Sequence, residues 1–133
     1  MEIKRFGVSL EKDVLEILDN YVAERKFPNR SQAIRHLIRS LHVDHEWEGN
    51  REVAGAIVLV YDHHKRELQT KSTTIQHDFH DLILSVQHVH LDHDSCLETI
   101  AVKGKANDLI QLADQLIAIK GIKHGKLVMS SVM

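Results

Sequence analysis

The 133-residue sequence has one cysteine, one proline and few aromatic residues, which make up 5% of the chain. A single cysteine excludes a framework of intrachain disulfides and suits the reducing cytoplasm. No apolar run reaches the roughly 18 residues that a membrane-spanning helix needs, and no signal-peptide pattern is present. These absences predict a soluble, cytoplasmic protein of one domain or two small ones, without a membrane partner.

Charge is almost balanced over the whole chain, with 17 basic and 19 acidic residues, but it is unevenly distributed. Five arginine and lysine residues and no acidic residue lie between Arg25 and Val43. Lys4 and Arg5 belong to another stretch without acidic residues, near the N-terminus. This asymmetry predicts an N-terminal part of the chain that faces an anionic partner.

The sequence is rich in histidine, with 11 residues. Five of them and the single cysteine, Cys96, lie in the stretch 76–98. Within it, the apolar run 82–91 contains His88 and His90 and predicts a strand. Because side chains alternate along a strand, the two imidazoles lie on one face, roughly 7 Å apart.

Residues 92–95 are polar and predict a turn, after which 96–102 predicts the returning strand of a hairpin. The hairpin brings the cysteine back beside His90. Two imidazoles and a thiolate on one patch predict a transition-metal site, for which zinc is the usual choice of Cys/His sets. The alternative is structural, since a lone cysteine on an apolar strand is usually a small packed side chain. A remaining ligand position is left for water, His77 or His80.

Residues 1–45 predict one strand and two helices. The stretch 3–10 alternates between apolar and polar or small residues, as a half-buried strand does. Apolar residues then recur at intervals of three and four over 11–25, and again from Ser31, which can N-cap the second helix, to about Leu41. About 45 residues bury too little surface to fold alone, and a single strand has two open edges. Pairing of two chains solves both problems, as in ribbon-helix-helix dimers that read the DNA major groove.

The sequence pattern of the remaining chain predicts a linker over 46–55 and a second domain over 56–133. The second domain has the order β-α-β-β-α-β, which is the ferredoxin-like split pattern. Its strands are predicted at 54–61, 82–91, 96–102 and 123–132, and its helices at 65–80 and 107–120. We therefore predict an α+β protein with a ribbon-helix-helix domain over 1–45 and a ferredoxin-like domain after the linker.

Two sets of residues carry a resemblance to a known family. The segments 5–10 (RFGVSL) and 29–35 (NRSQAIR) resemble those of ribbon-helix-helix repressors. Combined with the H-V-H motif at 88–90 and with Cys96, they make the whole chain resemble the nickel-responsive regulator (NikR) family. The resemblance implies that the second domain is an ACT-like metal-binding domain. It also implies a homotetramer, a dimer of dimers joined through these domains.

The resemblance further implies one Ni²⁺ per subunit, held by His88, His90 and Cys96 of one subunit and His77 of a neighbouring subunit. A planar arrangement of these donors favours Ni(II) or Cu(II) and a tetrahedral one favours zinc, so the preference for nickel rests on the resemblance. Glu98, two residues after the cysteine, faces the same way and can fix the tautomer of a ligand imidazole. Further residues that support the ligands are predicted at Gln76, Tyr61 and His63. Other histidines, namely His80, His93 and His124, are predicted to be solvated or to form an accessory site at excess metal.

Double-stranded operator DNA is the predicted macromolecular partner, and its predicted contacts are Lys4, Arg5, Gly7, Ser9, Arg30 and Ser31. Arg5 can bond to a guanine edge through two hydrogen bonds, and Ser9 can bond to a base or a phosphate. Gly7 has no side chain that could contact a base, so sequence specificity at that base pair depends on the residues beside it. The amides at the start of the second helix suit a phosphate, with Arg30 close by.

The second helix departs from the family pattern at two positions. The resemblance implies carboxylates there that hold a potassium-like ion, but this chain has Gln32 and His36. A neutral amide and an imidazole make a poor site for a hard cation. We therefore predict that DNA binding does not require potassium.

The predicted function is a metal-responsive transcriptional regulator without a small-molecule substrate. Three alternatives use the same histidines: a metal-storage or delivery protein, a regulator of another transition metal, and a zinc enzyme. Storage leaves the strand of Arg5 and Ser9 without a role. An enzyme lacks a nucleophile pattern and a general base other than Glu98, so we predict that the protein is not an enzyme.

Overall fold

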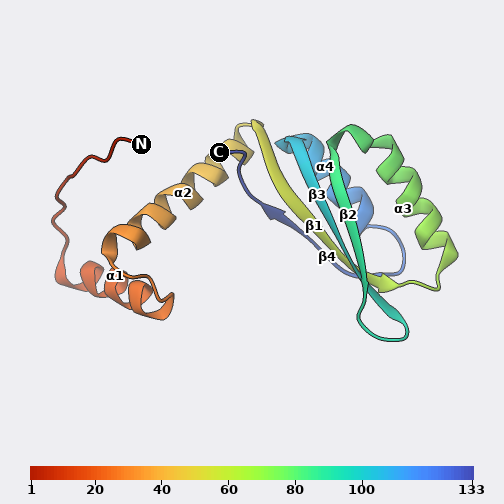
Figure 1. Cartoon of the computed structure of the whole chain (residues 1–133), viewed down its shortest axis with the longest axis horizontal. Helices are drawn as coiled ribbons and strands as arrows, with labels where there is room; N and C mark the ends of the chain where they lie inside the picture. Colours follow the sequence, from red (N-terminus) through yellow and green to blue (C-terminus); the bar gives the residue numbers. More distant parts are fainter. The chain divides into compact units, whose positions relative to one another are not determined.

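The computed structural model describes residues 1–133, which form two compact units, Met1–Leu41 and His42–Met133. No helix combines the length and apolar character needed to cross a membrane. Figure 1 labels the elements along the chain. They are α1 (Lys12–Glu24), α2 (Arg30–Glu48), β1 (Glu52–Asp62), α3 (Arg66–Asp78), η1 (His80–Leu82), β2 (Ile83–His90), β3 (Ser95–Lys105), α4 (Ala106–Ile117) and β4 (Ile122–Met129).

The first unit consists of an extended N-terminal segment, α1 and most of α2. The two helices form as predicted, but the strand predicted over 3–10 is absent from the single chain. A strand needs a neighbour for its N–H and C=O groups, and this unit contains no other strand. The unit also lacks a core of its own, because Ala33 is the only buried residue among residues 1–41.

Both ends of α2 differ from the prediction. The side-chain oxygen of Asn29 accepts the N–H of Gln32 at 2.9 Å, so Asn29 caps the helix and Ser31 lies in its first turn. At the other end α2 runs on to Glu48 instead of ending near residue 41. Its last turn is anchored because the indole N–H of the buried Trp47 donates to the carbonyl of Ser130 at 2.9 Å. Most of the segment predicted as a linker over 46–55 therefore lies in α2 or β1.

The second unit has the predicted β-α-β-β-α-β order. Its sheet is antiparallel with strand order β2-β3-β1-β4. Helices α3 and α4 cover one face of the sheet (Figure 1), and the apolar core fills the space between. The core takes alternate residues of β1 and β3 and one stripe of α4. The α+β class and the ferredoxin-like domain are confirmed.

Strand β2 lies at one edge of the sheet and is the least covered strand. Beyond Ile83 all of its residues are exposed, whereas alternate residues of its neighbour β3 are buried. The covered face of β3 therefore continues into an open face of β2. The change from a covered to an open face leaves room for a pocket beside the β2–β3 hairpin.

Candidate metal centre and nucleic-acid interface

The register of the β2–β3 hairpin aligns the predicted metal ligands. His90 lies opposite Cys96, and His88 lies opposite Glu98. On the other side of β3, Tyr61 of β1 also pairs with Cys96. Directly paired residues of an antiparallel sheet point to the same face, so these five side chains share the face covered by α3 and α4. The predicted pairing of the cysteine with His90 is confirmed.

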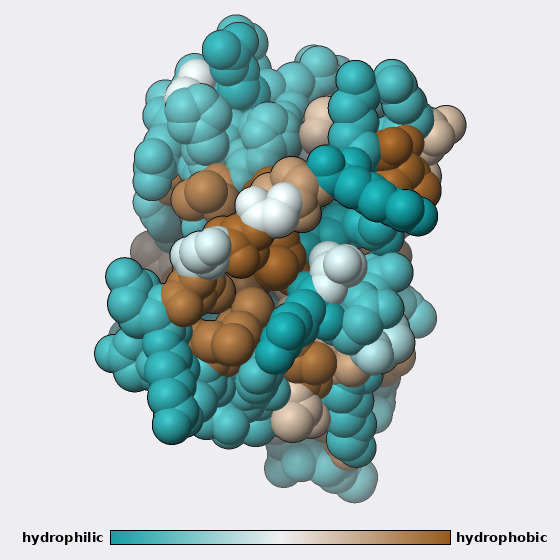
Figure 2. All heavy atoms as spheres, turned by 90° about the vertical axis from the view of Figure 1, so that its left-hand side faces the viewer, coloured by the Kyte–Doolittle hydropathy of each residue, from teal (hydrophilic) through white to brown (hydrophobic).

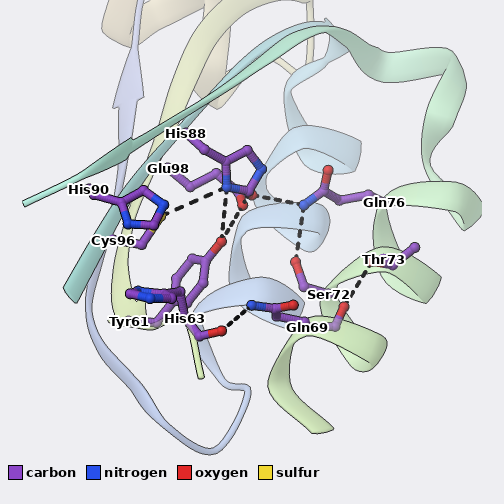
Figure 3. Close-up of a pocket in the computed structure, with 10 residues that line it drawn as sticks. All are labelled: Tyr61, His63, Gln69, Ser72, Thr73, Gln76, His88, His90, Cys96 and Glu98. Carbon is purple, nitrogen blue, oxygen red and sulfur yellow. Dashed lines mark hydrogen bonds and ion pairs between the residues drawn. The ribbon is translucent and has the colours of Figure 1, made fainter. Parts of the chain in front are cut away.

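A cavity of about 400 Å³ opens on this face, between the hairpin and α3 (Figure 3). Its lining side chains are Tyr61, His63, Gln69, Ser72, Thr73, Gln76, His88, His90, Cys96 and Glu98. Three of the four predicted ligands and all four predicted supporting residues are among them. Three further residues were not foreseen: Gln69, Ser72 and Thr73. With Gln76 they follow the spacing i, i+3, i+4, i+7, which is one stripe of α3 and a signal that the sequence contained.

Glu98 is the centre of a hydrogen-bond network at the base of the cavity. It is only 2% exposed and accepts the hydroxyl of Tyr61 at 2.6 Å and the amide of Gln76 at 2.9 Å. The Nε2 atom of His88 lies 3.1 Å from the same carboxylate. A buried carboxylate is tolerated only when its oxygens are satisfied in this way. The hydrogen-bond network around Glu98 therefore fixes the orientation of the His88 ring.

Tyr61 remains a proton donor in this network. Burial, followed by the hydrogen bond and the charge of Glu98, raises the pKa of the Tyr61 hydroxyl. Its oxygen also lies 3.3 Å from Nδ1 of His88. A phenolate, the form that would bind a metal, is thus disfavoured, and the Tyr61 hydroxyl instead orients its neighbours.

The donor atoms suit a transition-metal ion. The Sγ atom of Cys96, which is free and buried, lies 3.8 Å from Nδ1 of His88. The ring of His63 lies 4.5 Å from that of His90, and its Nδ1 atom is buried without a hydrogen-bond partner. Imidazole and thiolate donors beside an unpaired ring nitrogen fit a borderline metal better than a hard cation. The donor atoms of His88, His90 and Cys96 do not all lie within 4.8 Å of one another in the single chain. Binding one ion therefore requires these side chains to move.

His77 lies outside this cavity. It is exposed in the last turn of α3, where its ring stacks on that of His80 with the centroids 5.8 Å apart. The Nδ1 atom of His80 donates a hydrogen bond to the carbonyl of His77, 2.9 Å away. A single chain thus brings together three of the four predicted ligands and presents the fourth on its surface.

The predicted DNA contacts lie in the first unit. Lys4, Arg5, Gly7 and Ser9 are all exposed on the extended segment. Arg30 is already engaged, since its guanidinium forms two hydrogen bonds to Asp19 at 2.8 and 2.9 Å. These bonds hold the pKa of the Asp19 carboxyl below its usual range. Arg30 therefore links α1 to α2 in the single chain, a contact that the sequence did not predict.

Apolar side chains gather on one face of this unit (Figure 2). They enclose a groove of about 450 Å³ lined by Phe6, Val8, Leu10, Val14, Ile17, Leu18, Tyr21, Ile34 and Leu37. Phe6 is 76% exposed, Ile17 is 69% exposed and Val8 is 61% exposed. Apolar faces of this extent on a unit with one buried residue indicate a surface that a partner covers.

Two family models match the chain in the order of its units. Residues 4–44 match ribbon-helix-helix proteins of the CopG family, and residues 54–130 match the NikR C-terminal nickel-binding domain. The chain belongs to the NikR family of nickel-responsive regulators. Its ribbon-helix-helix domain implies DNA binding, and the protein is a transcription factor rather than an enzyme.

Similar proteins of other organisms agree with this assignment. A relative from Desulfotalea psychrophila is 54% identical, with 97% of this chain and 95% of that protein covered. A relative from Syntrophus aciditrophicus is 52% identical, with 98% and 96% covered. Both are named as nickel-responsive regulators. Among solved structures, an uncharacterised protein of Thermotoga maritima shares the fold of part of the chain, with a TM-score of 0.54, 15% identity and coverage of 59% of this chain and 98% of that one.

Proposed function

We propose that this NikR-family protein binds operator DNA when Ni²⁺ occupies a centre made by His88, His90 and Cys96 of one subunit and His77 of a neighbouring subunit. One ion binds per subunit, and the protein acts in the cytoplasm. The observation that carries the proposal is the cavity beside the hairpin, where imidazoles and the only thiol converge on the buried Glu98 network. When bound, the ion supplies a bond between the hairpin of one chain and a helix of another.

The chain's own residues prepare this centre. The carboxylate of Glu98, 3.1 Å from Nε2 of His88, restrains that ring and favours one of its tautomers. Gln76 and Tyr61 hold the carboxylate in turn. The thiol of Cys96 must lose its proton to bind a metal, so metal binding releases protons and weakens as the pH falls.

The apolar face of the first unit supports a dimer of N-terminal domains. A second copy of the same segment supplies the missing neighbour for residues 3–10, and its helices cover the groove. Arg5 and Ser9 then lie on a two-stranded ribbon of a kind that enters the DNA major groove. The dimer is therefore the unit that we propose for reading DNA.

A second interface lies on the metal-binding domain. The edge strand β2 exposes apolar side chains, with Leu84 65% and Val89 41% exposed. An uncovered apolar edge strand favours pairing with another chain. Two interfaces on one chain support a homotetramer in which metal-binding domains join two DNA-binding dimers. In this arrangement His77 of one chain reaches the cavity of another.

Nickel-dependent DNA binding is the direct test. We expect the untagged protein to select a sequence from a pool of random duplexes when nickel is present, and to lose most of this selectivity after chelation. A fluorescent duplex of the selected sequence then gives affinities by anisotropy. Arg5→Ala should weaken binding to this duplex by about 5- to 150-fold, the loss of one base contact worth about 1–3 kcal/mol. Nickel binding without any nickel-dependent DNA selection would instead indicate storage or delivery.

The Glu98 network provides a second prediction. Glu98→Gln keeps the shape of the side chain but removes its charge and directs an amide group at Gln76, itself a donor. We expect nickel affinity to fall by about 10- to 100-fold, the usual cost of losing a partner that orients a metal ligand. Competition with a chelator measures the change. Glu52→Gln, at the exposed start of β1, is the matched control, and equal affinities of both variants would contradict the role of Glu98.

The third prediction concerns potassium. Because Gln32 and His36 lack carboxylates, DNA affinity should be equal in sodium and potassium at matched ionic strength. Affinity should fall smoothly with either salt as counterions compete with Lys4, Arg5 and their neighbours for phosphates. The comparison includes Gln32→Glu/His36→Asp, in which a potassium preference should appear. A strong preference in the parent protein would show that the ion site has other ligands.

A further inference from the structure

The end of α2 is held by the last residues of the chain (Figure 1). Helix α2 begins in the first unit and ends in the second, so it is the segment that the two domains share. Trp47, in its last turn, is 4% exposed and bonded to the carbonyl of Ser130. We propose that Glu46, Trp47 and residues 130–133 form a clamp on the end of α2, and that this clamp transmits nickel binding to α2 and so to the DNA-binding domain.

The C-terminal part of the clamp is itself fixed to the sheet. The N–H of Ser130 donates to the carbonyl of Ala54 at 2.9 Å, which prolongs the pairing of β4 with β1. The hydroxyl of Ser131 donates to a carboxylate oxygen of Glu46 at 2.9 Å. Glu46 and Trp47 thus bind successive residues of one segment, and that segment is bound to β1. The end of α2 is therefore attached to the sheet through two side chains.

The indole ring of Trp47 also packs on the sheet. It belongs to the apolar core of the second unit, and Val43, one turn earlier in α2, packs against this core. Below the ring, β1 has a glycine: a Cβ atom at Gly55 would lie 3.5 Å from Cζ2 of Trp47 and would clash with the carbonyl of Val128. A buried aromatic ring with a bonded N–H favours one position of the helix end, because moving it costs both contacts.

The turn after α2 adds a third attachment. The N–H of Arg51 donates to the carbonyl of Glu46 at 2.9 Å, which closes the turn. The carbonyl of Arg51 accepts the N–H of Ala106 at 3.0 Å, and the side-chain oxygen of Asn50 accepts the N–H of Asn107 at 2.8 Å. Both acceptors bind free N–H groups at the start of α4. Helix ends usually open easily, but this one is tied to β1, α4 and the C-terminal segment.

The clamp and the metal centre share two strands. Strand β1 begins beside the clamp, at Ala54 and Gly55, and carries Tyr61 of the metal cavity near its other end. Strand β3 carries Cys96 and Glu98 and leads directly into α4. Nickel that stabilises this sheet therefore also stabilises the end of α2, as long as the clamp makes the helix end open together with the sheet. Without the clamp the helix end opens by itself, and metal binding no longer reaches it.

Amide hydrogen exchange of the full-length protein tests this transmission without DNA. Nickel stabilises the folded state by mass action, so it slows exchange only in segments that open together with the sheet. We expect nickel to slow exchange of residues 42–48 in the parent. Trp47→Phe/Glu46→Ala keeps an apolar ring but removes both hydrogen bonds of the clamp, and in this clamp variant nickel should leave the exchange of 42–48 unchanged. Glu48→Ala changes an exposed residue of the same turn and is the matched control, expected to behave as the parent.

Only the DNA measurement rests on the proposed function. The ratio of DNA affinities with and without nickel, measured by anisotropy on a selected duplex, gives the coupling between metal and DNA. We expect the clamp variant to lower this ratio by about 2- to 30-fold, the usual effect of substitutions between coupled sites. Its nickel affinity, measured by chelator competition, should equal the parent's. A merely structural role would lower nickel affinity and leave the ratio unchanged.

The outcomes separate the clamp from the proposed function. Exchange of residues 42–48 that does not respond to nickel in the parent, or responds equally in the parent and the clamp variant, overturns the clamp. So does an unchanged affinity ratio in the clamp variant when the parent's DNA binding depends on nickel. If exchange responds as expected but the parent's DNA binding does not depend on nickel, the proposed function fails, and transmission from the metal centre to α2 stands.

Discussion

Replacing Cys96 with alanine is expected to reduce nickel affinity by more than about 100-fold, beyond the usual effect of losing a residue that only orients a ligand. The reason is that the thiolate is the only negatively charged soft donor in the cavity. The same variant should lose the thiolate-to-nickel charge-transfer band. Chelator competition measures the affinity, and absorbance measures the band. Nickel-dependent DNA binding should disappear with both.

The fold should survive this substitution. Cys96 is 2% exposed on β3, and exchanging its thiol for hydrogen removes one buried atom, a change within the usual range of about 0.5–3 kcal/mol for single substitutions. Thermal unfolding of the metal-free variant therefore serves as the control for folding, and His124→Ala as the control for loss of a side chain elsewhere. A Cys96→Ala protein that keeps the parent's affinity and band would show that the ligand set is wrong.

The part of the site on the hairpin was predictable because it depends on local rules. Alternation places His88 and His90 on one face, and a short polar turn sets the register that brings Cys96 opposite His90. The side chains on α3 were not recognised, since the polar residues at 69, 72 and 73 do not stand out in a polar helix.

The differences in the fold arise from contacts between distant residues or between chains. Helix α2 continues to Glu48 because the indole of Trp47 is hydrogen-bonded to Ser130 near the C-terminus. Hydrophobic periodicity does not reveal such a contact. Arg30 pairs with Asp19 across two helices, although the sequence predicted only a DNA contact for it. The strand over 3–10 has the correct alternation but no neighbour within its own chain. Alternation predicts which face is apolar, whereas a strand also requires a partner.

Introducing a charge on the apolar face of the first unit should abolish DNA binding. Ile17 lines the groove on α1 but is 69% exposed in the single chain, so Ile17→Glu costs little if that surface stays in water. If a second copy covers it, the variant buries an unpaired carboxylate, which costs several kcal/mol. At about 1.4 kcal/mol for each factor of ten, the dimer of N-terminal domains weakens by more than about 100-fold. DNA affinity should fall by at least as much.

Ala23→Glu is the matched control, because it places the same charge on α1 at an exposed position outside the groove. Anisotropy with a selected duplex measures DNA affinity, and amide hydrogen exchange of α1 reports whether its helix stays protected. We expect rapid exchange in Ile17→Glu and parent-like protection in Ala23→Glu. The metal centre, which lies in the second unit, should bind nickel equally in both. If the two variants bind DNA alike, the groove remains exposed in the functional protein, and the ribbon must be completed through another surface.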